Sequence, residues 1–291
     1  MSSELADRIA RLTGLPVRSV RPVGAQHGYQ HLEIAFADGT RGFGKIHQSN
    51  PENGGGRAFT AEANGLRWLA EARAVPIPEV LGADDTALII SMIPEADSQA
   101  STHAAHRFGV DLARLHAAGA DSFGAPWPGV IASLPLDNTP GESWPEWYAE
   151  YRLEPFLRLA ASAGLLRDED VSLVEAVISR LASLAGPPEP PSRIHGDCWS
   201  GNILWSGGRG WLIDPAAHGG HRETDLAMLA LFGAPYLPAV LEGYAETVPL
   251  AAGWQDRVPL HQLHPLLVHV CLFGESYRPA VSAAARSALS A

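Results

Sequence analysis

Two neighbouring segments decide the fold: IHGDCWSGNILW at residues 194–205 and GWLIDPA at residues 210–216. Asp197 stands five residues before Asn202, and Asp214 follows twelve residues later at the end of an apolar run. Phosphoryl transfer from a metal–nucleotide complex needs such groups, because one carboxylate must orient the attacking hydroxyl while an amide and a second carboxylate hold Mg²⁺. Each residue alone is more typical of an Asx-turn in a loop. The ordered set predicts a phosphoryl-transfer site.

Hydrophobic patterning on the N-terminal side predicts a small sheet with helices. Residues 29–40 alternate apolar and polar side chains and end on Asp38-Gly39, a strong hairpin signal, so residues 41–47 become the returning strand. Apolar side chains recur at helical spacing across residues 57–73. A further helix and two further strands are predicted at residues 4–13, 77–83 and 86–93. These elements predict an α+β unit built around an antiparallel sheet.

The C-terminal side is predicted to be mainly helical. Amphipathic patterns favour helices at residues 104–118, 143–164, 167–186, 221–233, 236–246 and 260–277, with short strand-like pieces at 193–197, 202–206 and 210–215. The pattern changes between residues 91 and 97, which we interpret as a hinge. The predicted fold class is therefore α+β and bilobal, with a sheet-containing lobe at residues 1–93 and a helical lobe at residues 94–291.

Composition excludes several classes of function. The net charge of −11 argues against non-specific nucleic-acid binding, since contacts to phosphate need a basic surface. The sequence has no run of about 18 apolar residues, so no membrane span is expected, and the N-terminus lacks the apolar region of a signal peptide. Cys198 and Cys271 stand alone. We expect a cytoplasmic, reduced, monomeric protein without a disulfide framework.

The segment at residues 194–205 resembles the catalytic loop of protein-kinase-like phosphotransferases, in the His-Gly-Asp variant of the aminoglycoside and choline kinases. The longer string HGDCWSGNILW…LIDPAAHGGHRETDLAMLALFG is narrower and resembles the fructosamine kinase (ketosamine 3-kinase) family. That family has HGD-x-WSGN, then IDPA, then GGHRE-x-DLAM. NTPGESWPEWYAEYRLEPFL and LLVHVCLFGESY also resemble its helical segments. The resemblance implies a kinase-like fold whose N-terminal lobe binds ATP.

The resemblance also implies roles for individual residues. Asp197 would be the catalytic base, and Asn202 and Asp214 would hold Mg²⁺. Lys45 would bind the α- and β-phosphates of ATP and pair with Glu62 on the predicted helix. Lys45 is the only lysine in a chain that otherwise uses arginine, which weakens the alternative of a solvated strand residue. A compact ammonium can contact phosphate and carboxylate together, whereas a planar guanidinium favours a two-pronged grip.

Further nucleotide contacts are expected at two places. Gly24 and Gly28 would form a turn over the phosphates, although a plain turn explains them nearly as well. The backbones of Ser91, Met92 and Ile93, at the end of the last strand of the N-terminal lobe, would hydrogen-bond to adenine. Their alternative is core and linker.

Substrate contacts are expected after the catalytic base. Trp199 lies in a polar loop, where its indole could stack on a sugar or ketosamine. Arg222 and Glu223 are candidate substrate contacts with a structural role as the alternative, and Asp225 is expected to bond to the backbone of the catalytic loop. The family pattern has a histidine where this chain has Pro265, which puts that contact in doubt.

The histidines were considered as zinc ligands. His261, His264 and His269 fall within one predicted helix, and His218 and His221 are three residues apart. Neither group has a Cys pair or an acidic ligand at zinc spacing, so we interpret them as surface or substrate-cleft histidines.

The implied reaction is transfer of the γ-phosphoryl group of ATP to a hydroxyl of a ketosamine, with the 3-hydroxyl expected. The phosphorylated adduct is unstable and releases its amine, which is a repair function. Two alternatives stay open. One is a kinase of the same fold for an aminoglycoside or an amino alcohol such as choline, and the other is a non-catalytic binding protein that kept the fold. The sequence leaves open which ketosamine is preferred.

Overall fold

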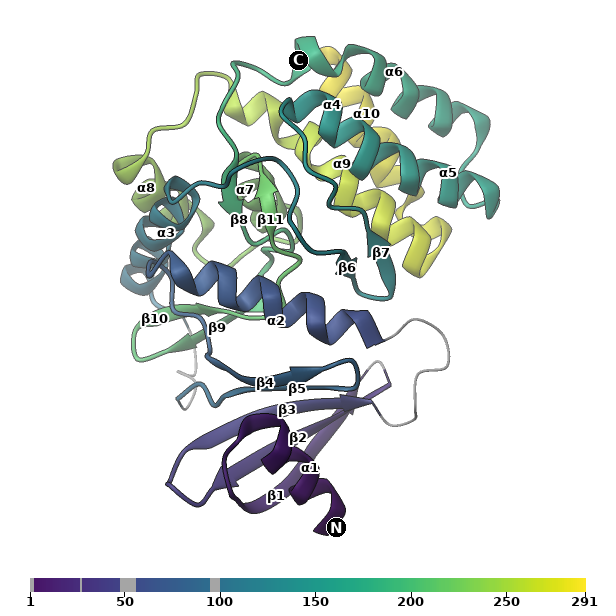
Figure 1. Cartoon of the computed structure of the whole chain (residues 1–291). Coiled ribbons are helices and arrows are strands. Elements are labelled where there is room, and N and C mark those ends of the chain that lie inside the picture. Colours follow the sequence, from purple (N-terminus) through teal and green to yellow (C-terminus); the bar gives the residue numbers. More distant parts are fainter. Residues whose placement is uncertain (1–2, 27, 48–55, 95–99) are drawn as a thin grey trace.

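The computed structural model describes residues 3–26, 28–47, 56–94 and 100–291. A small part built on an antiparallel sheet lies at one end, and a larger, mainly helical part lies at the other (Figure 1). This arrangement confirms the predicted α+β class. Residues 95–97 of the expected hinge fall outside the described residues. Within them, every helix is too short or too polar to span a bilayer.

The N-terminal part follows the predicted order of helices and strands. The sheet order is β1-β2-β3-β5-β4, and all of its pairs are antiparallel. Leu32, Ile34 and Phe36 alternate with partly exposed residues, as the sequence pattern predicted, and all three are fully buried. Gly39 closes the β2–β3 hairpin with a φ of 92°, which favours glycine. The elements are α1 (Ser3–Thr13), β1 (Val17–Gln26), β2 (Tyr29–Phe36), β3 (Arg41–His47), α2 (Gly56–Glu71), β4 (Val80–Asp84) and β5 (Ala87–Ser91).

Helix α2 connects the sheet to the rest of the molecule. Its apolar side chains Phe59 and Leu66 pack in one cluster with Leu88 and Ile90 of β5. A Cβ added at Gly65 would lie 3.2 Å from the Cβ of Ala217 and 3.3 Å from Cγ of Pro215. The helix backbone therefore runs directly against the loop that follows Asp214, and this contact sets where Glu62 can reach.

The C-terminal part surrounds short strand pairs with helices (Figure 1). Two clusters of buried side chains form most of its core, one along α9 and one around α3. Its elements are α3 (Thr102–Ala117), β6 (Gly129–Ile131), β7 (Leu134–Leu136), α4 (Trp144–Tyr148), η1 (Ala149–Leu153), α5 (Glu154–Ser162), α6 (Asp168–Leu184), β8 (Ser192–Ile194), η2 (Ser200–Asn202), β9 (Ile203–Ser206), β10 (Arg209–Leu212), β11 (His218–Gly220), α7 (Glu223–Leu231), α8 (Leu237–Thr247), α9 (Trp254–Phe273), η3 (Glu275–Tyr277) and α10 (Arg278–Ser290).

The helix predicted at residues 143–164 is not continuous. A π-helical turn, η1, separates α4 from α5, and the Glu154 N–H bonds back to Ala149 O. Pro155 follows immediately and has no N–H to continue a regular α-helical ladder, so the wider turn absorbs the mismatch.

Helix α9 begins six residues earlier than predicted and contains Pro259 and Pro265. Pro265 has no N–H, so it cannot donate the helix hydrogen bond to His261 O. The hydroxyl of Tyr148 lies 3.3 Å from this carbonyl oxygen and donates to it instead.

Candidate active site

The catalytic loop begins where β8 ends. Gly196 has a φ of 79°, and a Cβ at this position would lie 2.3 Å from Ala216 O, so the turn admits only glycine. Asn202 Nδ2 donates to Asp197 Oδ2 at 2.9 Å and to Asp197 O, also at 2.9 Å. This use of Nδ2 leaves the carbonyl oxygen of Asn202 as the atom that could face a cation, the kind of ligand that Mg²⁺ accepts. Asn202 and Asp214 therefore offer oxygen atoms of the kind that could hold a divalent metal.

Asp225 holds the loop from below, as the sequence predicted. Its two carboxylate oxygens accept the backbone N–H of His195 at 2.7 Å and of Gly196 at 2.9 Å. Burial opposes its charge, but hydrogen bonds from His116 and the backbone hold the pKa of Asp225 below its ordinary value. No sequence motif pointed to His116, whose Nε2 lies 3.1 Å from Asp225 and whose Nδ1 lies 2.8 Å from the Tyr244 hydroxyl.

Lys45 joins the two parts of the molecule. Its Nζ donates to Glu62 Oε1 at 2.8 Å and to Asp214 Oδ1 at 2.5 Å, and only 11% of its side chain is exposed. Burial disfavours the charged ammonium, but the two carboxylates outweigh it and raise the pKa of Lys45. Burial, helped by the charge of Asp214, raises the pKa of Glu62. Lys45 is therefore a fixed cation beside the loop that carries Asp214.

Asp214 has an unusual backbone conformation and an exposed side chain. Its φ of 54° places it in the left-handed region, which Asp tolerates better than most residues. Its side chain is 43% exposed, far more than those of Lys45 and Glu62 beside it. The carboxylate is therefore accessible to a cation from solvent.

Asp197 has the electrostatics of a general base. Burial raises its pKa to about 7 against the hydrogen bond from Asn202, and the charges of Asp214 and Asp225 add to the rise. A base with a pKa near the working pH combines a useful ionised fraction with enough basicity to accept a proton.

The structure gives fewer contacts for the residues predicted to bind the nucleotide. Gly28 turns the chain between β1 and β2 with a φ of 82°, and neither Gly24 nor Gly28 has a neighbour that a Cβ would touch. The N–H groups of Ser91 and Met92 are already used, by Glu79 O and Arg41 O. A backbone contact to adenine stays a prediction, and those two N–H groups are not free to make it. The task would fall to Ile93 and to carbonyl oxygens.

The predicted substrate residues have different environments. Trp199 is 37% exposed, and its ring covers Gly201, where a Cβ would come within 2.2 Å of it. Arg222 is bound through Nε and Nη2 to Glu189, at 2.7 and 2.6 Å. Glu223 is 2% exposed and receives two bonds from Arg257, at 2.9 and 2.6 Å. The structural alternative named for Arg222 and Glu223 accounts for these pairs, and their substrate role stays untested.

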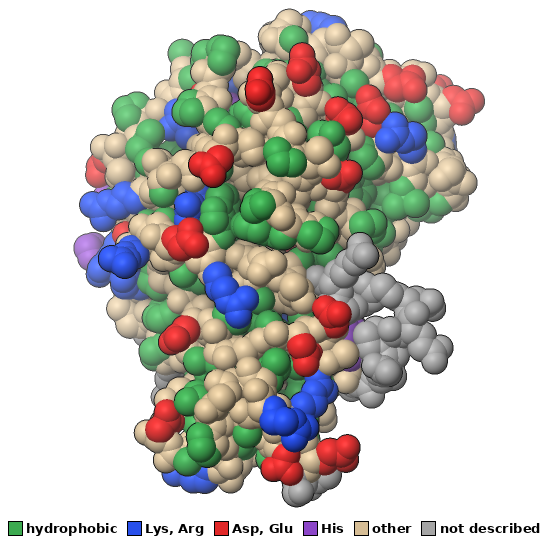
Figure 2. All heavy atoms as spheres, viewed as in Figure 1, with side chains coloured by type: hydrophobic (Ala, Val, Ile, Leu, Met, Phe, Trp, Pro, Cys, Tyr) green, Lys and Arg blue, Asp and Glu red, His purple; other side chains and the backbone are tan. Residues whose placement is uncertain are grey.

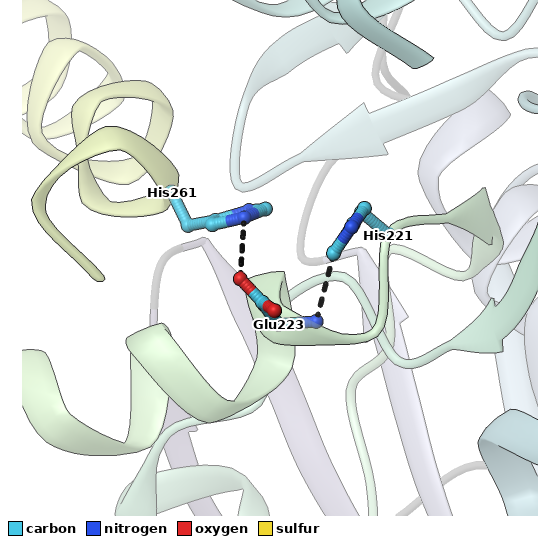
Figure 3. Close-up of side chains that lie close together, drawn as sticks. All are labelled: His221, Glu223 and His261. Carbon is cyan, nitrogen blue, oxygen red and sulfur yellow. Dashed lines mark hydrogen bonds and ion pairs between the residues drawn. The ribbon is translucent and has the colours of Figure 1, made fainter. Parts of the chain in front are cut away.

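Glu223 also lies beside His221 and His261, two histidines that are 40 residues apart in the sequence. Ligand atoms of His221, Glu223 and His261 fall within 4.8 Å of one another (Figure 3). His261 Nε2 lies 3.4 Å from the carboxylate, and His221 Nδ1 receives the Glu223 N–H at 3.3 Å. Arg257 already binds both carboxylate oxygens, so a cation would have to displace a guanidinium. We interpret the cluster as an ion-pair network.

The expected surface position was wrong for four of the five histidines considered as zinc ligands, and a place in a substrate cleft stays a prediction. His218, His221, His261 and His264 are all buried, and burial lowers the pKa of each, so they belong to the core rather than to the surface. His269 is only partly buried.

On the face shown in Figure 2, acidic and basic side chains are interspersed rather than gathered in a single-sign patch.

A family model described as fructosamine kinase matches residues 5–291. "Probable ketoamine kinase YniA" of Escherichia coli K12 is 34% identical over 265 residues, covering 89% of this chain and 88% of that protein. "Probable ketoamine kinase slr1563" of Synechocystis is 31% identical over 283 residues, covering 94% and 92%.

Solved structures give the same picture. The crystal structure of a "putative fructosamine-3-kinase" from Thermobifida fusca is 51% identical, covers 100% of both chains and superposes with a TM-score of 0.95. The gentamicin complex of APH(2'')-IIa is 13% identical, covers 100% of this chain and 97% of its own, and has a TM-score of 0.65. The second likeness concerns the fold alone, which is that of the aminoglycoside phosphotransferases.

Proposed function

The chain belongs to the fructosamine kinase family, and on this premise we propose that it transfers the γ-phosphoryl group of ATP to the 3-hydroxyl of a ketosamine. It is an ATP-dependent phosphotransferase of the kinase-like fold. Phosphorylation at this hydroxyl destabilises the adduct, so the amine is freed and the reaction repairs glycated amines. We further propose that the protein is a cytoplasmic monomer and that the reaction uses Mg²⁺. The N-terminal lobe would end at residue 93 and the C-terminal lobe would begin at residue 94.

One observation carries the proposal: Lys45 Nζ contacts Asp214 across 169 residues of sequence while Asn202 contacts Asp197. Asn202 Nδ2 also lies 3.4 Å from Asp214 O, which links the two pairs. The proximity of these four polar groups supports a single phosphoryl-transfer site. Glu62 anchors Lys45 from the other side.

Each residue then has a step to perform. Asp197 accepts the proton of the substrate hydroxyl as the hydroxyl oxygen attacks the γ-phosphorus, and the bond from the γ-phosphorus to the bridging oxygen breaks so that ADP leaves. Lys45 turns its ammonium to the α- and β-phosphates and remains bonded to Glu62. Asn202, through its carbonyl oxygen, and Asp214 would hold Mg²⁺, which when bound neutralises phosphate charge. Asp225 keeps the backbone of the loop, and hence Asp197, in place.

A phosphorylation panel tests this proposal. ATP consumption is measured with free and protein-linked ketosamines of fructose, ribulose and erythrulose, with an aminoglycoside and choline as controls. We expect turnover on ketosamines only, a ³¹P coupling that places phosphate at the 3-position, and release of the amine. Turnover confined to an aminoglycoside or to choline would instead support the alternative kinases.

A further inference from the structure

Aromatic side chains form a continuous row that starts at the catalytic loop. Successive ring centroids lie 6.1 Å apart from Trp199 to Phe232, 5.1 Å from Phe232 to His269 and 5.4 Å from His269 to Phe273. Tyr277 closes the row, 4.9 Å from His269 and 6.0 Å from Phe273. We call these five residues the aromatic row. Its first member stands two positions after Asp197 in the chain.

The aromatic row draws its residues from four places in the fold: the residue before η2, the end of α7, the last turns of α9 and η3. Phe232 caps the C-terminus of α7, and His269 and Phe273 are one turn apart on α9. Gly274 ends α9 with a φ of 84°, which brings Tyr277 of η3 back onto His269. The alignment thus depends on the fold and not on one flexible loop.

Exposure of the row is not explained by core packing. Phe273 is 59% exposed, Phe232 38% and Trp199 37%. Single exposed apolar side chains are common, but apolar side chains in contact beside a reaction site indicate a binding surface. These three rings would lose water-exposed apolar area on binding a ligand.

His269 adds one polar atom to this apolar surface. Its Nδ1 lies 2.6 Å from Pro265 O, a carbonyl that can only accept, so Nδ1 carries the hydrogen. Nε2 is then a hydrogen-bond acceptor. Burial lowers the pKa of His269, so the ring is neutral at pH 7.

We propose that the aromatic row binds the amine half of the ketosamine, and that it favours an extended alkylammonium group over a small amine. This inference rests on the proposed function. The sugar must lie at Asp197, so a substrate with its sugar on Trp199 has its nitrogen and carbon chain directed along Phe232, His269 and Phe273. Ring faces attract a protonated amine and cover its methylenes, and Nε2 of His269 accepts an N–H. Exposed Glu275, between Phe273 and Tyr277, has the complementary charge.

The test compares two ketosamines that share one sugar, made from methylamine and from hexylamine. We expect wild-type kcat/KM to be higher for the hexylamine adduct. Phe232→Ala and Phe273→Ala should each lower kcat/KM for that adduct by roughly 3- to 30-fold, because methylenes lose the rings that cover them. For the methylamine adduct, which carries the same ammonium without these methylenes, the change should be less than about twofold. Phe273→Tyr keeps the ring face and should keep the preference.

Leu159→Ala is the matched control, because Leu159 is 44% exposed on α5 and lies outside the aromatic row. It should alter neither value. Equal losses on both substrates, or losses on neither, overturn the aromatic row as an amine site while leaving the proposed function intact. A wild-type protein that phosphorylates neither adduct overturns the proposed function and this inference with it.

Discussion

Lys45 Nζ lies 2.5 Å from Asp214 Oδ1, although 169 residues separate them in the chain. The ion pair links the sheet to the loop that carries Asp214. If Lys45 binds ATP as proposed, phosphate would replace Asp214 as one of its partners. Because Glu62 holds the same ammonium at 2.8 Å, Lys45 can exchange Asp214 for phosphate without becoming free. The position therefore requires a compact charge that reaches two partners at once.

Lys45→Arg tests this requirement. The guanidinium is longer and planar, and the side chain is enclosed except for 11% of its area, so both contacts cannot be kept. We expect kcat/KM for ATP to fall by about 100-fold or more. The melting temperature should fall as well, because a buried carboxylate loses its partner. Arg107→Lys, on the exposed side of α3, is the control and should have no effect. Wild-type kinetics in Lys45→Arg would show that charge alone suffices.

Asp197→Asn separates chemistry from binding. The amide cannot accept the proton of the substrate hydroxyl, so we expect single-turnover phosphorylation to slow by about 10²- to 10⁴-fold. Binding of Mg-ATP, measured by calorimetry, should stay within a few-fold of wild type. If phosphorylation persists at the wild-type rate, Asp197 is not the base.

Short motifs made the chemistry of the site predictable. Phosphoryl transfer fixes both residue type and spacing around Asp197, so the sequence alone indicated Asn202 and Asp214. The lone lysine drew attention to Lys45, and the family resemblance implied that Lys45 pairs with Glu62. The sheet was equally accessible, because alternation across Leu32, Ile34 and Phe36 specifies a buried face.

Long-range partners could not be predicted. His116 supports Asp225 from 109 residues away, and Glu189, which stands between prolines in the sequence, pairs with Arg222. Such pairs leave no periodic trace, since either partner alone looks like an ordinary polar residue. The burial of His221 and His261 was missed for the same reason, and so was the aromatic row, whose members come from separate elements.

Asp225→Asn tests how much the hydrogen bonds that Asp225 accepts from the backbone of the catalytic loop contribute to stability. One carboxylate oxygen becomes an NH₂ that faces a backbone N–H, and the charge that His116 satisfies is lost. We expect the free energy of unfolding to fall by about 1.5–3 kcal/mol and turnover to fall with it. Asp121→Asn, at an exposed position, is the control. A stable Asp225→Asn variant with full activity would contradict the role assigned to this carboxylate.

Glu223 predicts how stability depends on pH. Burial opposes its ionisation, but hydrogen bonds from His261 and Arg257 lower its pKa from 4.5 to about 2. Because the unfolded chain binds the proton more tightly, this carboxylate stabilises the fold fully above about pH 4.5, and the contribution is lost as the pH falls toward 2. The shift corresponds to about 3 kcal/mol.

Denaturant unfolding of wild type and Glu223→Gln between pH 3 and 7 checks this. The gap in unfolding free energy between the two proteins should be widest near neutral pH and should narrow below pH 4.5, because the neutral glutamine already lacks the ion pair with Arg257. Glu142→Gln, in an exposed position, should leave the wild-type pH profile unchanged. A constant gap across the whole range would mean that Glu223 stabilises the fold by packing rather than by its charge.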